Sequence, residues 1–520
     1  MAITISFSKW LGLIRSSLRL CYFAILPVKL NKYSFLLTSG TSRSLRDWLP
    51  LLSGIVLAGA MYGINPFSVD HHANVVLAIA ALMITWWVTE ALPMPVVALL
   101  PLILFPLLGV STLKQTSVAY GDSILFLFLG GFMIGLAIEK WNLHTRIALT
   151  IIRATGTSGN RIVLGFILAT GFLSMWLSNT ATTMMMYPIA VSLIHVVGEN
   201  RQGHGNLRNF SLTVMLAIAY ASNFGGIATI IGTPPNVAFA AFIKNKYDYS
   251  IAFIDWLLIC APIAFLLLIT LYWTMTRWLF PNGLKADAAT KVVIRQKLDE
   301  LGPVRTSEKR VLWIFGTTAA LWITRDLINA VSDFALDDTM IAMMGATALF
   351  IVPSGSKDKE SKRILEWKDT TKMAWGIILL FGGGIALASA LEKAGLIERM
   401  GTWIAGFSGS GGFLLILVIT IVSLFISEVM SNIAQVIVFS PVIGGIADAI
   451  GVHPLELGIP MTLAASCASM MPMGTPPNAI VFASGHIRLH EMVKTGFVMN
   501  IIAVILISLF SYFVVPLVVS

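Results

Sequence analysis

Residues 172–190 read FLSMWLSNTATTMMMYPIA and place a polar motif, Ser178-Asn179-Thr180, in apolar surroundings, ten residues before Pro188. The motif recurs 253 residues later (431 − 178) as Ser431-Asn432-Ile433, again ten residues before a proline, Pro441. The same displacement relates Glu139-Lys140 to Glu392-Lys393, Gly130-Gly131 to Gly383-Gly384, and Arg146 to Arg399. This regular spacing indicates that the second half of the chain repeats the first.

A second string supports the same duplication. Gly232-Thr233-Pro234-Pro235-Asn236 recurs 242 residues later (474 − 232) as Gly474-Thr475-Pro476-Pro477-Asn478. Two motifs that recur in the same order, with one short deletion between them, indicate an internally duplicated protein. Duplicated halves with proline-broken polar segments inside apolar sequence are the best sequence indication of a transporter's binding site.

The composition is that of an integral membrane protein. The chain has 520 residues, of which 57% are hydrophobic and only 12% charged, whereas soluble domains carry about 25% charged residues. Its apolar runs of roughly 16–25 residues are long enough for membrane-spanning helices and too long for barrel strands. The net charge of +9 does not indicate nucleic-acid binding, because the Lys and Arg residues lie in loops beside the spans. Cys21, Cys260 and Cys467 show no metal spacing, and no cofactor is expected.

We therefore predict an all-α polytopic membrane protein with about eleven transmembrane helices and two re-entrant helical hairpins. The hairpins are 161–197 and 411–447, because a polar motif lies near the middle of each. Such irregular backbone must be buried in protein or face a water-filled cavity. The predicted spans are 48–64, 74–91, 94–110, 123–139, 207–232, 250–276, 309–330, 338–353, 373–391, 456–475 and 493–518.

The distribution of basic residues predicts the orientation. Loop 277–310 carries eight Lys and Arg residues and loop 354–372 carries six, whereas 331–338 between them carries three aspartates and no Lys or Arg. The positive-inside rule then places the amino terminus in the cytoplasm and the carboxyl terminus outside, in a plasma or inner membrane. Five spans separate the hairpins, so the hairpins enter from opposite faces. The duplication is thus predicted to be an inverted-topology repeat whose two tips meet near the midplane.

The predicted spans and hairpins divide the chain into five regions. They are a basic cytosolic tail (1–47), a first span (48–73), a first inverted repeat with its hairpin (74–276), a cytosolic linker (277–308) and a second inverted repeat with its hairpin (309–520). Residues 1–46 hold seven basic residues and no acid, a pattern also typical of an organellar transit peptide.

The broken helices suggest what the tips bind. A helix interrupted in mid-membrane leaves carbonyl groups unpaired at one end and N–H groups at the other. Carbonyl oxygens suit a hard cation, and the N–H ends suit a carboxylate or another oxyanion. Tandem proline breaks the following span in each half. One tip and one broken helix per half predict two cation sites with an anion pocket between them.

These motifs resemble those of the divalent anion:sodium symporter family, whose members carry di- and tricarboxylates or sulfate. The resemblance covers nearly all of residues 48–520 and implies sodium as the coupling ion and a homodimer. It implies a first sodium site at Ser174, Ser178, Asn179 and Gly232, and a second at Ser427, Met430, Asn432, Gly474 and Pro476. The implied substrate contacts are Asn179, Thr180, Thr233, Asn432 and Thr475. Ile433 departs from the pattern, because a threonine often completes the second motif; this bears on the identity of the substrate.

The charge distribution favours cation coupling. Lys and Arg are absent from 162–200 and from 400–487, so a dianion at the midplane must be compensated by co-bound cations and helix dipoles. Glu428, three residues before Ser431, needs a partner or a proton at this depth. The expected function is sodium-coupled transport of small dicarboxylates such as succinate, malate or fumarate.

Alternatives on the same fold are an anion exchanger and a sodium-coupled sulfate or citrate carrier. Alternatives of other classes are a channel and a membrane-embedded enzyme. The sequence shows no His-Glu metal motif, nucleotide-binding glycine loop or Ser-His-Asp arrangement in a plausible context, so no enzyme activity is expected.

Overall fold

The computed structural model describes residues 45–199, 206–286, 288–332, 335–355, 362–399 and 412–519. Most of the predicted amino-terminal tail (1–44) and the beginning of the second predicted hairpin (411) lie outside these residues. Within them the chain is all-helical, and an isolated bridge between Pro353 and Arg363 is its one β contact. The chain divides after Val97 into two compact units, which are described separately.

The first unit contains α2 (Leu45–Ile64), α3 (His71–Val88) and the short α4 (Met94–Val97). The indole Nε1 of Trp86 on α3 donates to the carbonyl oxygen of Leu51 on α2 at 3.0 Å. A Cβ on Gly54 would lie 2.2 Å from that Nε1, so only glycine allows this approach. The predicted span 48–64 lies on α2, whereas the predicted span 74–91 is helical only to Val88, the end of α3.

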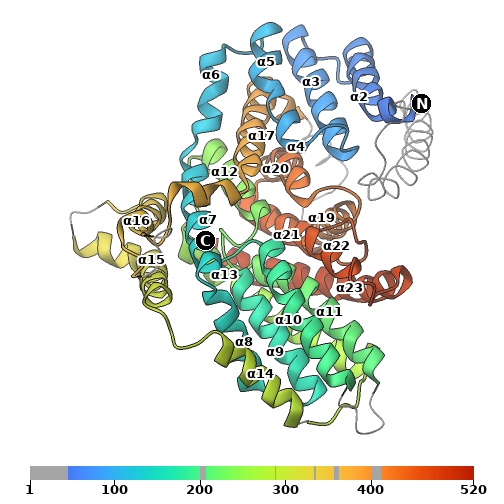
Figure 1. Ribbon diagram of the computed structural model, residues 1–520. Coiled ribbons are helices and arrows are strands. Elements are labelled where there is room, and N and C mark those ends of the chain that lie inside the picture. Colours follow the sequence, from blue (N-terminus) through green and yellow to red (C-terminus); the bar gives the residue numbers. More distant parts are fainter. Residues whose placement is uncertain are drawn as a thin grey trace. The chain divides into compact units, whose positions relative to one another are not determined.

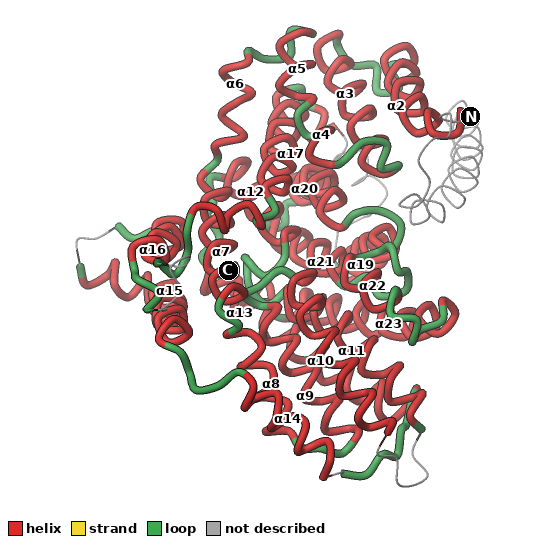
Figure 2. Tube along the Cα trace, in the orientation of Figure 1, coloured by secondary structure: helices red, strands yellow, loops and turns green. Residues whose placement is uncertain are grey.

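The second unit holds both copies of the duplicated motifs, and Figures 1 and 2 show its helices and the loops that interrupt them. Its first half contains α5 (Leu100–Leu107), α6 (Leu113–Val118), η2 (Ala119–Gly121), α7 (Ser123–Lys140), α8 (Leu143–Thr155), α9 (Gly159–Ser174), α10 (Asn179–Glu199), α11 (Leu207–Gly226), α12 (Pro234–Tyr247), α13 (Phe253–Trp273) and the π-helical η3 (Thr274–Leu279). Its second half contains α14 (Ala288–Glu300), α15 (Thr306–Val331), α16 (Asp338–Ile351), η4 (Trp367–Lys372), α17 (Trp375–Lys393), α19 (Phe413–Ser427), α20 (Asn432–Ile450), α21 (Pro454–Ser466), α22 (Pro476–Phe482), α23 (Leu489–Phe513) and α24 (Val515–Val519).

Paired glycines bring helices of the second unit close together. A Cβ on Gly130 of α7 would lie 2.7 Å from the carbonyl carbon of Ala342 on α16. A Cβ on Gly383 of α17 would lie 2.3 Å from the carbonyl oxygen of Ala98, which also accepts a hydrogen bond from the hydroxyl of Tyr120. The two equivalent glycine pairs therefore serve packing in both halves.

Among the described residues, eight helices are long and apolar enough to cross a membrane, and five apolar helices are shorter. Every predicted span lies on helix, but some predicted ends were wrong. The predicted span 207–232 is helical only to Gly226, and 456–475 only to Ser466. The predicted span 94–110 is interrupted between α4 and α5. The count of eleven spans stays a prediction.

Candidate functional site

Each half contains two interruptions of helix. The first tip (175–178) separates α9 from α10, and the second tip (428–431) separates α19 from α20. The first break (227–233) separates α11 from α12, and the second break (467–475) separates α21 from α22. Tandem proline occupies the first turn of α12 and of α22, where its missing N–H costs nothing and its fixed φ favours the helix. In both halves, the helix after the break thus begins with two prolines.

Hydrogen bonds connect the first tip to α11 and the first break. The hydroxyl of Ser174 lies 2.7 Å from Asn179 Oδ1 and 2.8 Å from the carbonyl oxygen of Ser222. The hydroxyl of Thr229 in the first break donates to the carbonyl oxygen of Met175 in the tip. Ser174 is fully buried and Asn179 is buried. The two residues that flank the first tip are therefore held against α11.

Two glycines next to the first tip create a cradle lined by oxygen. A Cβ on Gly226 would lie 2.2 Å from Asn179 Oδ1. A Cβ on Gly232 would lie 2.4 Å from the carbonyl oxygen of Gly226 and 3.0 Å from that of Ser174. A larger residue at either glycine would therefore collide with one of three uncharged oxygens, Asn179 Oδ1 and the carbonyl oxygens of Gly226 and Ser174. This donor set fits a hard cation, which takes about six oxygen ligands.

The structure therefore brings together Ser174, Asn179 and Gly232 of the predicted first sodium site. Ser178, the fourth residue, lies on the tip itself, where its hydroxyl accepts a hydrogen bond from Ala181 N at 3.3 Å. Of the predicted substrate contacts in this half, Thr180 lies half-buried in the first turn of α10 and Thr233 is buried directly before α12. The predicted residues of the first half thus gather around one tip and one break.

The second half places its predicted residues on equivalent elements. The hydroxyl of Ser427 donates to the carbonyl oxygen of Ala465 at 2.5 Å, and Asn432 Oδ1 accepts from Ile433 N at 2.9 Å. A Cβ on Gly474 would lie 3.1 Å from Glu428 Oε2 and 3.3 Å from the carbonyl oxygen of Met471. The other predicted residues of this half lie nearby in the chain: Met430 is buried in the tip, Thr475 is buried in the break, and Pro476 begins α22.

Glu428 has partners in the second break and on α23. It is 4% exposed, and its carboxylate accepts four hydrogen bonds. The donors are Ser469 N (2.8 Å), Met470 N (2.8 Å), Met471 N (2.9 Å) and Asn500 Nδ2 (2.6 Å). Backbone N–H groups freed by the break thus stabilise the buried negative charge. Of the two alternatives predicted from the sequence, a partner or a proton, the structure shows a partner for Glu428. Met175 occupies the equivalent position in the first half.

One asparagine closes each break in the same way. Asn236 Nδ2 donates to the carbonyl oxygen of Thr229 at 2.8 Å and lies 3.4 Å from those of Gly226 and Ile227. Asn478 Nδ2 donates to the carbonyl oxygens of Ala468 at 3.2 Å and Met471 at 3.1 Å. These acceptors are related by the displacement of the motif strings, 242 residues. The internal duplication thus extends from the motifs to their hydrogen bonds.

Asn223 joins the two halves. Its Nδ2 donates to Thr475 Oγ1 of the second break at 3.1 Å, and its Oδ1 lies 3.5 Å from Asn179 Nδ2. Ser222, Asn223, Gly226, Asn236 and Asn478 are not among the predicted sodium or substrate ligands. A signal existed, because Ser222-Asn223 is a polar pair in an apolar run, and the two asparagines end the duplicated strings. The first tip and the second break therefore belong to one hydrogen-bonded cluster.

The bases of the two hairpins lie at opposite ends of α23. Asn282 bonds both Asn160, at the base of the first hairpin, and Asn206, which precedes α11. Next to Asn206, Arg208 pairs with Glu491 in the first turn of α23. At the other end, the ring of Tyr512 lies 5.7 Å from that of Phe413, the first residue of α19. Since α23 has 25 residues, it is about 37 Å long.

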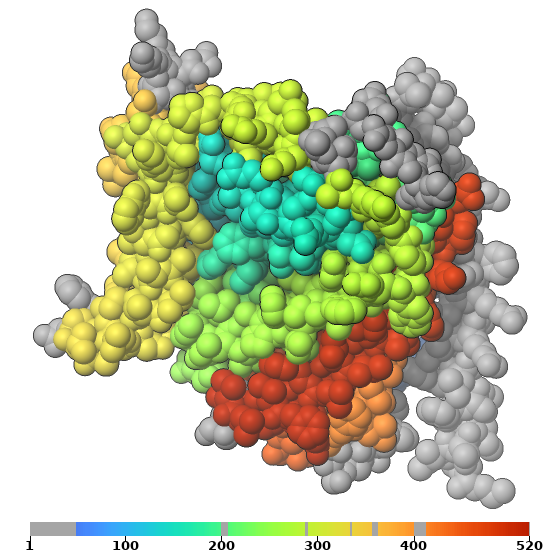
Figure 3. All heavy atoms as spheres, turned by 90° about the horizontal axis from the view of Figure 1, so that it is seen from below, coloured from blue at the N-terminus to red at the C-terminus, as the bar shows by residue number. Residues whose placement is uncertain are grey.

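Helix α13 lies beside α23 (Figure 3), and its contacts also place the bases of the two hairpins at opposite ends. Asn282, which bonds the base of the first hairpin, follows the end of α13 and η3. Tyr249 precedes the beginning of α13, and its ring centroid lies 6.0 Å from that of His453, which follows the second hairpin. These contacts support hairpins that enter from opposite faces. The inverted orientation of the repeat stays a prediction.

Comparisons with known proteins place this chain among membrane transporters. The family described as "Sodium:sulfate symporter transmembrane region" matches residues 46–519. The chain is 40% identical over 476 residues to the sodium-dependent dicarboxylate transporter SdcS of Staphylococcus saprophyticus, covering 89% of this chain and 91% of that protein. It is 42% identical over 450 residues to SdcS of Staphylococcus aureus strain USA300, covering 85% and 86%.

A solved structure is similar in fold. The crystal structure of the Alcanivorax borkumensis YdaH transporter, described as having an unusual topology, aligns with a TM-score of 0.58 and 13% sequence identity. The alignment covers 86% of this chain and 99% of that one. At this identity the likeness shows the fold alone. With a family match over nearly its whole length and relatives above 30% identity, the chain belongs to the sodium:sulfate symporter family.

Proposed function

We propose that the chain is a sodium-coupled secondary transporter that carries small dicarboxylates of the succinate, malate and fumarate class by alternating access. The observation that carries this proposal is the glycine-lined cradle at the first tip, where Asn179 Oδ1 lies against Gly226 and the carbonyl oxygens of Gly226 and Ser174 lie against Gly232. The names of the relatives, sodium-dependent dicarboxylate transporters, support the same substrate class.

The charge balance explains why the anion needs sodium. Neither tip has a Lys or Arg within 162–200 or 400–487, and Glu428 adds a buried negative charge to the second. A dianion between the tips would therefore face no fixed positive charge, and burying it uncompensated would be very costly. Sodium ions at both tips would neutralise it, so the affinity for the anion would depend on sodium.

We assign the residues as follows. The first sodium site uses Ser174, Ser178, Asn179 and Gly232, and the second uses Ser427, Met430, Asn432, Gly474 and Pro476. The dicarboxylate lies between them and contacts Asn179, Thr180, Thr233, Asn432 and Thr475. Support comes from the bridge through Asn223, which connects Asn179 with Thr475, and from α10 and α20, which begin at Asn179 and Asn432 with their positive dipole ends at the tips.

The membrane arrangement is part of the proposal. The two hairpins form a mobile module with the broken helices and enter from opposite faces, with the amino terminus in the cytoplasm and the carboxyl terminus outside. The protein acts as a homodimer in a plasma or inner membrane. Support for the opposed hairpins comes from the two ends of α23. Arg208, beside the Asn206–Asn282–Asn160 link to the base of the first hairpin, pairs with Glu491 in the first turn of α23, and Phe413 at the base of the second hairpin contacts Tyr512 near its end.

The test is uptake of radiolabelled succinate into proteoliposomes. An inward sodium gradient should drive accumulation, and replacing sodium by potassium should abolish it, with unlabelled malate and fumarate competing. Succinate uptake that needs internal dicarboxylate but no sodium would instead identify an anion exchanger. Stronger competition by sulfate or citrate than by malate would move the substrate class to one of those anions.

A further inference from the structure

The first tip carries a tryptophan that stacks between helices. The ring of Trp176 is stacked on that of Phe253, the first residue of α13, with centroids 6.0 Å apart and planes inclined by 23°. It also meets Phe315 of α15 edge-on at 4.9 Å. Phe253 is fully buried and stacks in turn on Trp322 of α15, at 4.6 Å and 16°. Three rings therefore form a continuous stack from the tip to α15.

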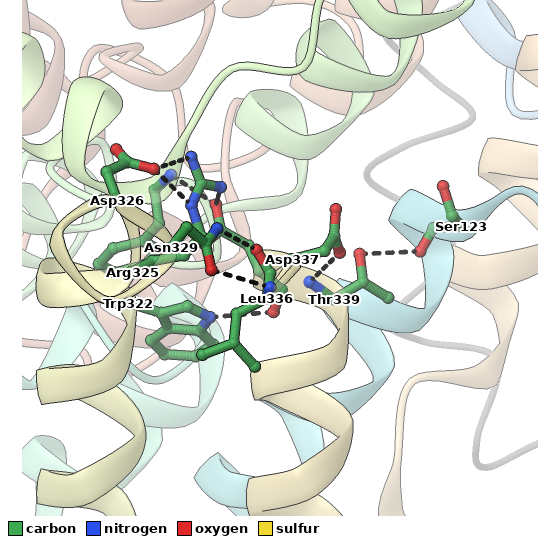
Figure 4. A network of polar contacts seen from close by, with 10 residues as sticks. Ser123, Trp322, Arg325, Asp326, Asn329, Leu336, Asp337 and Thr339 are labelled. Atoms are coloured by element: carbon green, nitrogen blue, oxygen red, sulfur yellow. Dashed lines mark hydrogen bonds and ion pairs between the residues drawn. The ribbon is translucent and has the colours of Figure 1, made fainter. Parts of the chain in front are cut away.

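Polar contacts fix the far end of this stack. The indole of Trp322 donates to the carbonyl oxygen of Asp338, the first residue of α16, at 3.0 Å. The carboxylate of Asp338 accepts from Phe253 N at 2.8 Å and pairs with Arg325 at 3.0 Å. Figure 4 shows Trp322 and Arg325 pointing from α15 toward the beginning of α16. Both Phe253 and Trp322 are thus held in place independently of the tip.

The first turn of α13 also contacts the first break. The indole of Trp256, which is fully buried, donates to the carbonyl oxygen of Ile227 at 3.1 Å. One helical turn therefore touches both parts of the first cradle, the tip through Phe253 and the break through Trp256. Anything that anchors this turn also fixes the distance between tip and break.

The second tip has no equivalent ring. Its residue at the position of Trp176 is Val429 (176 + 253), whose side chain is 50% exposed. The two tips carry matching Ser-Asn motifs but differ at this position. The difference offers a control inside the same molecule.

We propose that Trp176, through its stack on Phe253 and Trp322, is a positioning residue for the first sodium site. The stack holds the tip in the conformation in which Ser174 and Asn179 face Gly226 and Gly232. Trp176 does not touch the ion; it lowers the cost of ordering the tip when sodium binds. The inference rests on the proposed sodium coupling and adds a specific route by which α15 and α16 determine sodium affinity.

The experiment compares Trp176→Ala, Trp176→Phe and Val429→Ala. For each purified protein, the sodium concentration that half-maximally raises the melting temperature reports ion binding without transport. The sodium dependence of succinate uptake reports the same affinity in proteoliposomes. Trp176→Ala should raise both half-saturating concentrations roughly threefold to tenfold, the range expected for lost aromatic pairs. Trp176→Phe, which keeps a ring, should stay within about twofold of the wild type, as should Val429→Ala.

A purely structural role predicts another pattern. The melting temperature of Trp176→Ala without sodium would fall, while the half-saturating sodium concentration would stay that of the wild type; this result overturns the proposal. A wild-type protein without any sodium response would instead refute the proposed function itself. If Trp176→Ala does not fold, Phe253→Leu decides, because it interrupts the stack at its middle and should produce the same shift in sodium affinity.

Discussion

The two tips are held in place by different side chains, although the breaks beside them are closed by equivalent ones. Both breaks are closed by an asparagine that bonds equivalent carbonyl groups, Asn236 in the first half and Asn478 in the second. The residues that hold the tips in place differ. Met175-Trp176 uses an aromatic stack, whereas Glu428-Val429 at the equivalent positions uses a carboxylate with four hydrogen bonds. The duplication has thus kept the groups that complete the broken backbone and changed those that anchor it.

This difference has an electrostatic consequence. The first cradle offers only uncharged oxygens, whereas the second tip lies beside a buried carboxylate near Gly474. A cation at the second tip is attracted by a fixed negative charge that a cation at the first tip lacks.

The largest effect is expected at the residue that both tips share. Asn179→Ala removes an oxygen of the first cradle, and Asn432→Ala removes its counterpart. Either change should reduce succinate uptake to background, because each asparagine is assigned to a sodium ion and to the anion at once. Uptake per amount of folded protein, checked by size-exclusion chromatography, measures this. Near-normal uptake by both variants would contradict the assignment of Asn179 and Asn432 to the binding site.

Glu428→Gln should destabilise the second tip. The amide cannot accept all four hydrogen bonds, and its NH₂ group would face backbone donors; lost hydrogen bonds to a charged group cost about 1.5–3 kcal/mol each. We expect a clear fall in the free energy of unfolding, measured in detergent by denaturant titration. Met175→Leu at the equivalent position is a volume-conserving change and should cost less than about 1.5 kcal/mol. Equal losses for the two variants would contradict the contrast between the tips.

Gly226→Ala and Ala468→Gly exchange a second pair of equivalent residues. A Cβ on Gly226 would lie 2.2 Å from Asn179 Oδ1, so the alanine should displace that oxygen and weaken sodium activation of uptake at least tenfold, about 1.4 kcal/mol. The second break already holds alanine here, and Ala468→Gly should cost only about 1 kcal/mol of stability. Unchanged sodium activation in Gly226→Ala would show that the first cradle does not bind the ion.

The smallest effect is expected from Ile433→Thr, which makes the second motif match the first. The added hydroxyl provides one hydrogen bond, worth about 0.5–1.5 kcal/mol. We expect the KM for succinate to fall by a factor of roughly two to ten, with the half-saturating sodium concentration unchanged. Competition kinetics with malate and fumarate measure the change. A shift in sodium dependence instead would place residue 433 at the ion rather than at the anion.

The sequence predicted the parts of this site that depend on local chemistry. Tandem proline interrupts a helix, so the breaks before α12 and α22 followed from the Pro-Pro strings. The two tips followed from the polar Ser-Asn motifs in apolar sequence. The ends of α11 and α21 could not be predicted, because apolar sequence continues beyond Gly226 and Ser466, where the helices already end.

Contacts between distant segments could not be predicted. Asn223 and Thr475 are 252 positions apart, and nothing local to Asn223 indicates its partner. The same holds for the Trp176–Phe253–Trp322 stack, whose rings come from three separate elements. The need of Glu428 for a partner followed from its apolar surroundings, but its donors depend on how the second break folds.

If sodium ions, rather than basic side chains, neutralise the dicarboxylate between the tips, sodium and succinate must enter together. Uptake of labelled sodium and of labelled succinate, measured in the same proteoliposomes, tests this. We predict at least two sodium ions taken up per succinate, and no net succinate uptake when potassium replaces sodium. Net succinate uptake without any accompanying sodium would contradict the claim.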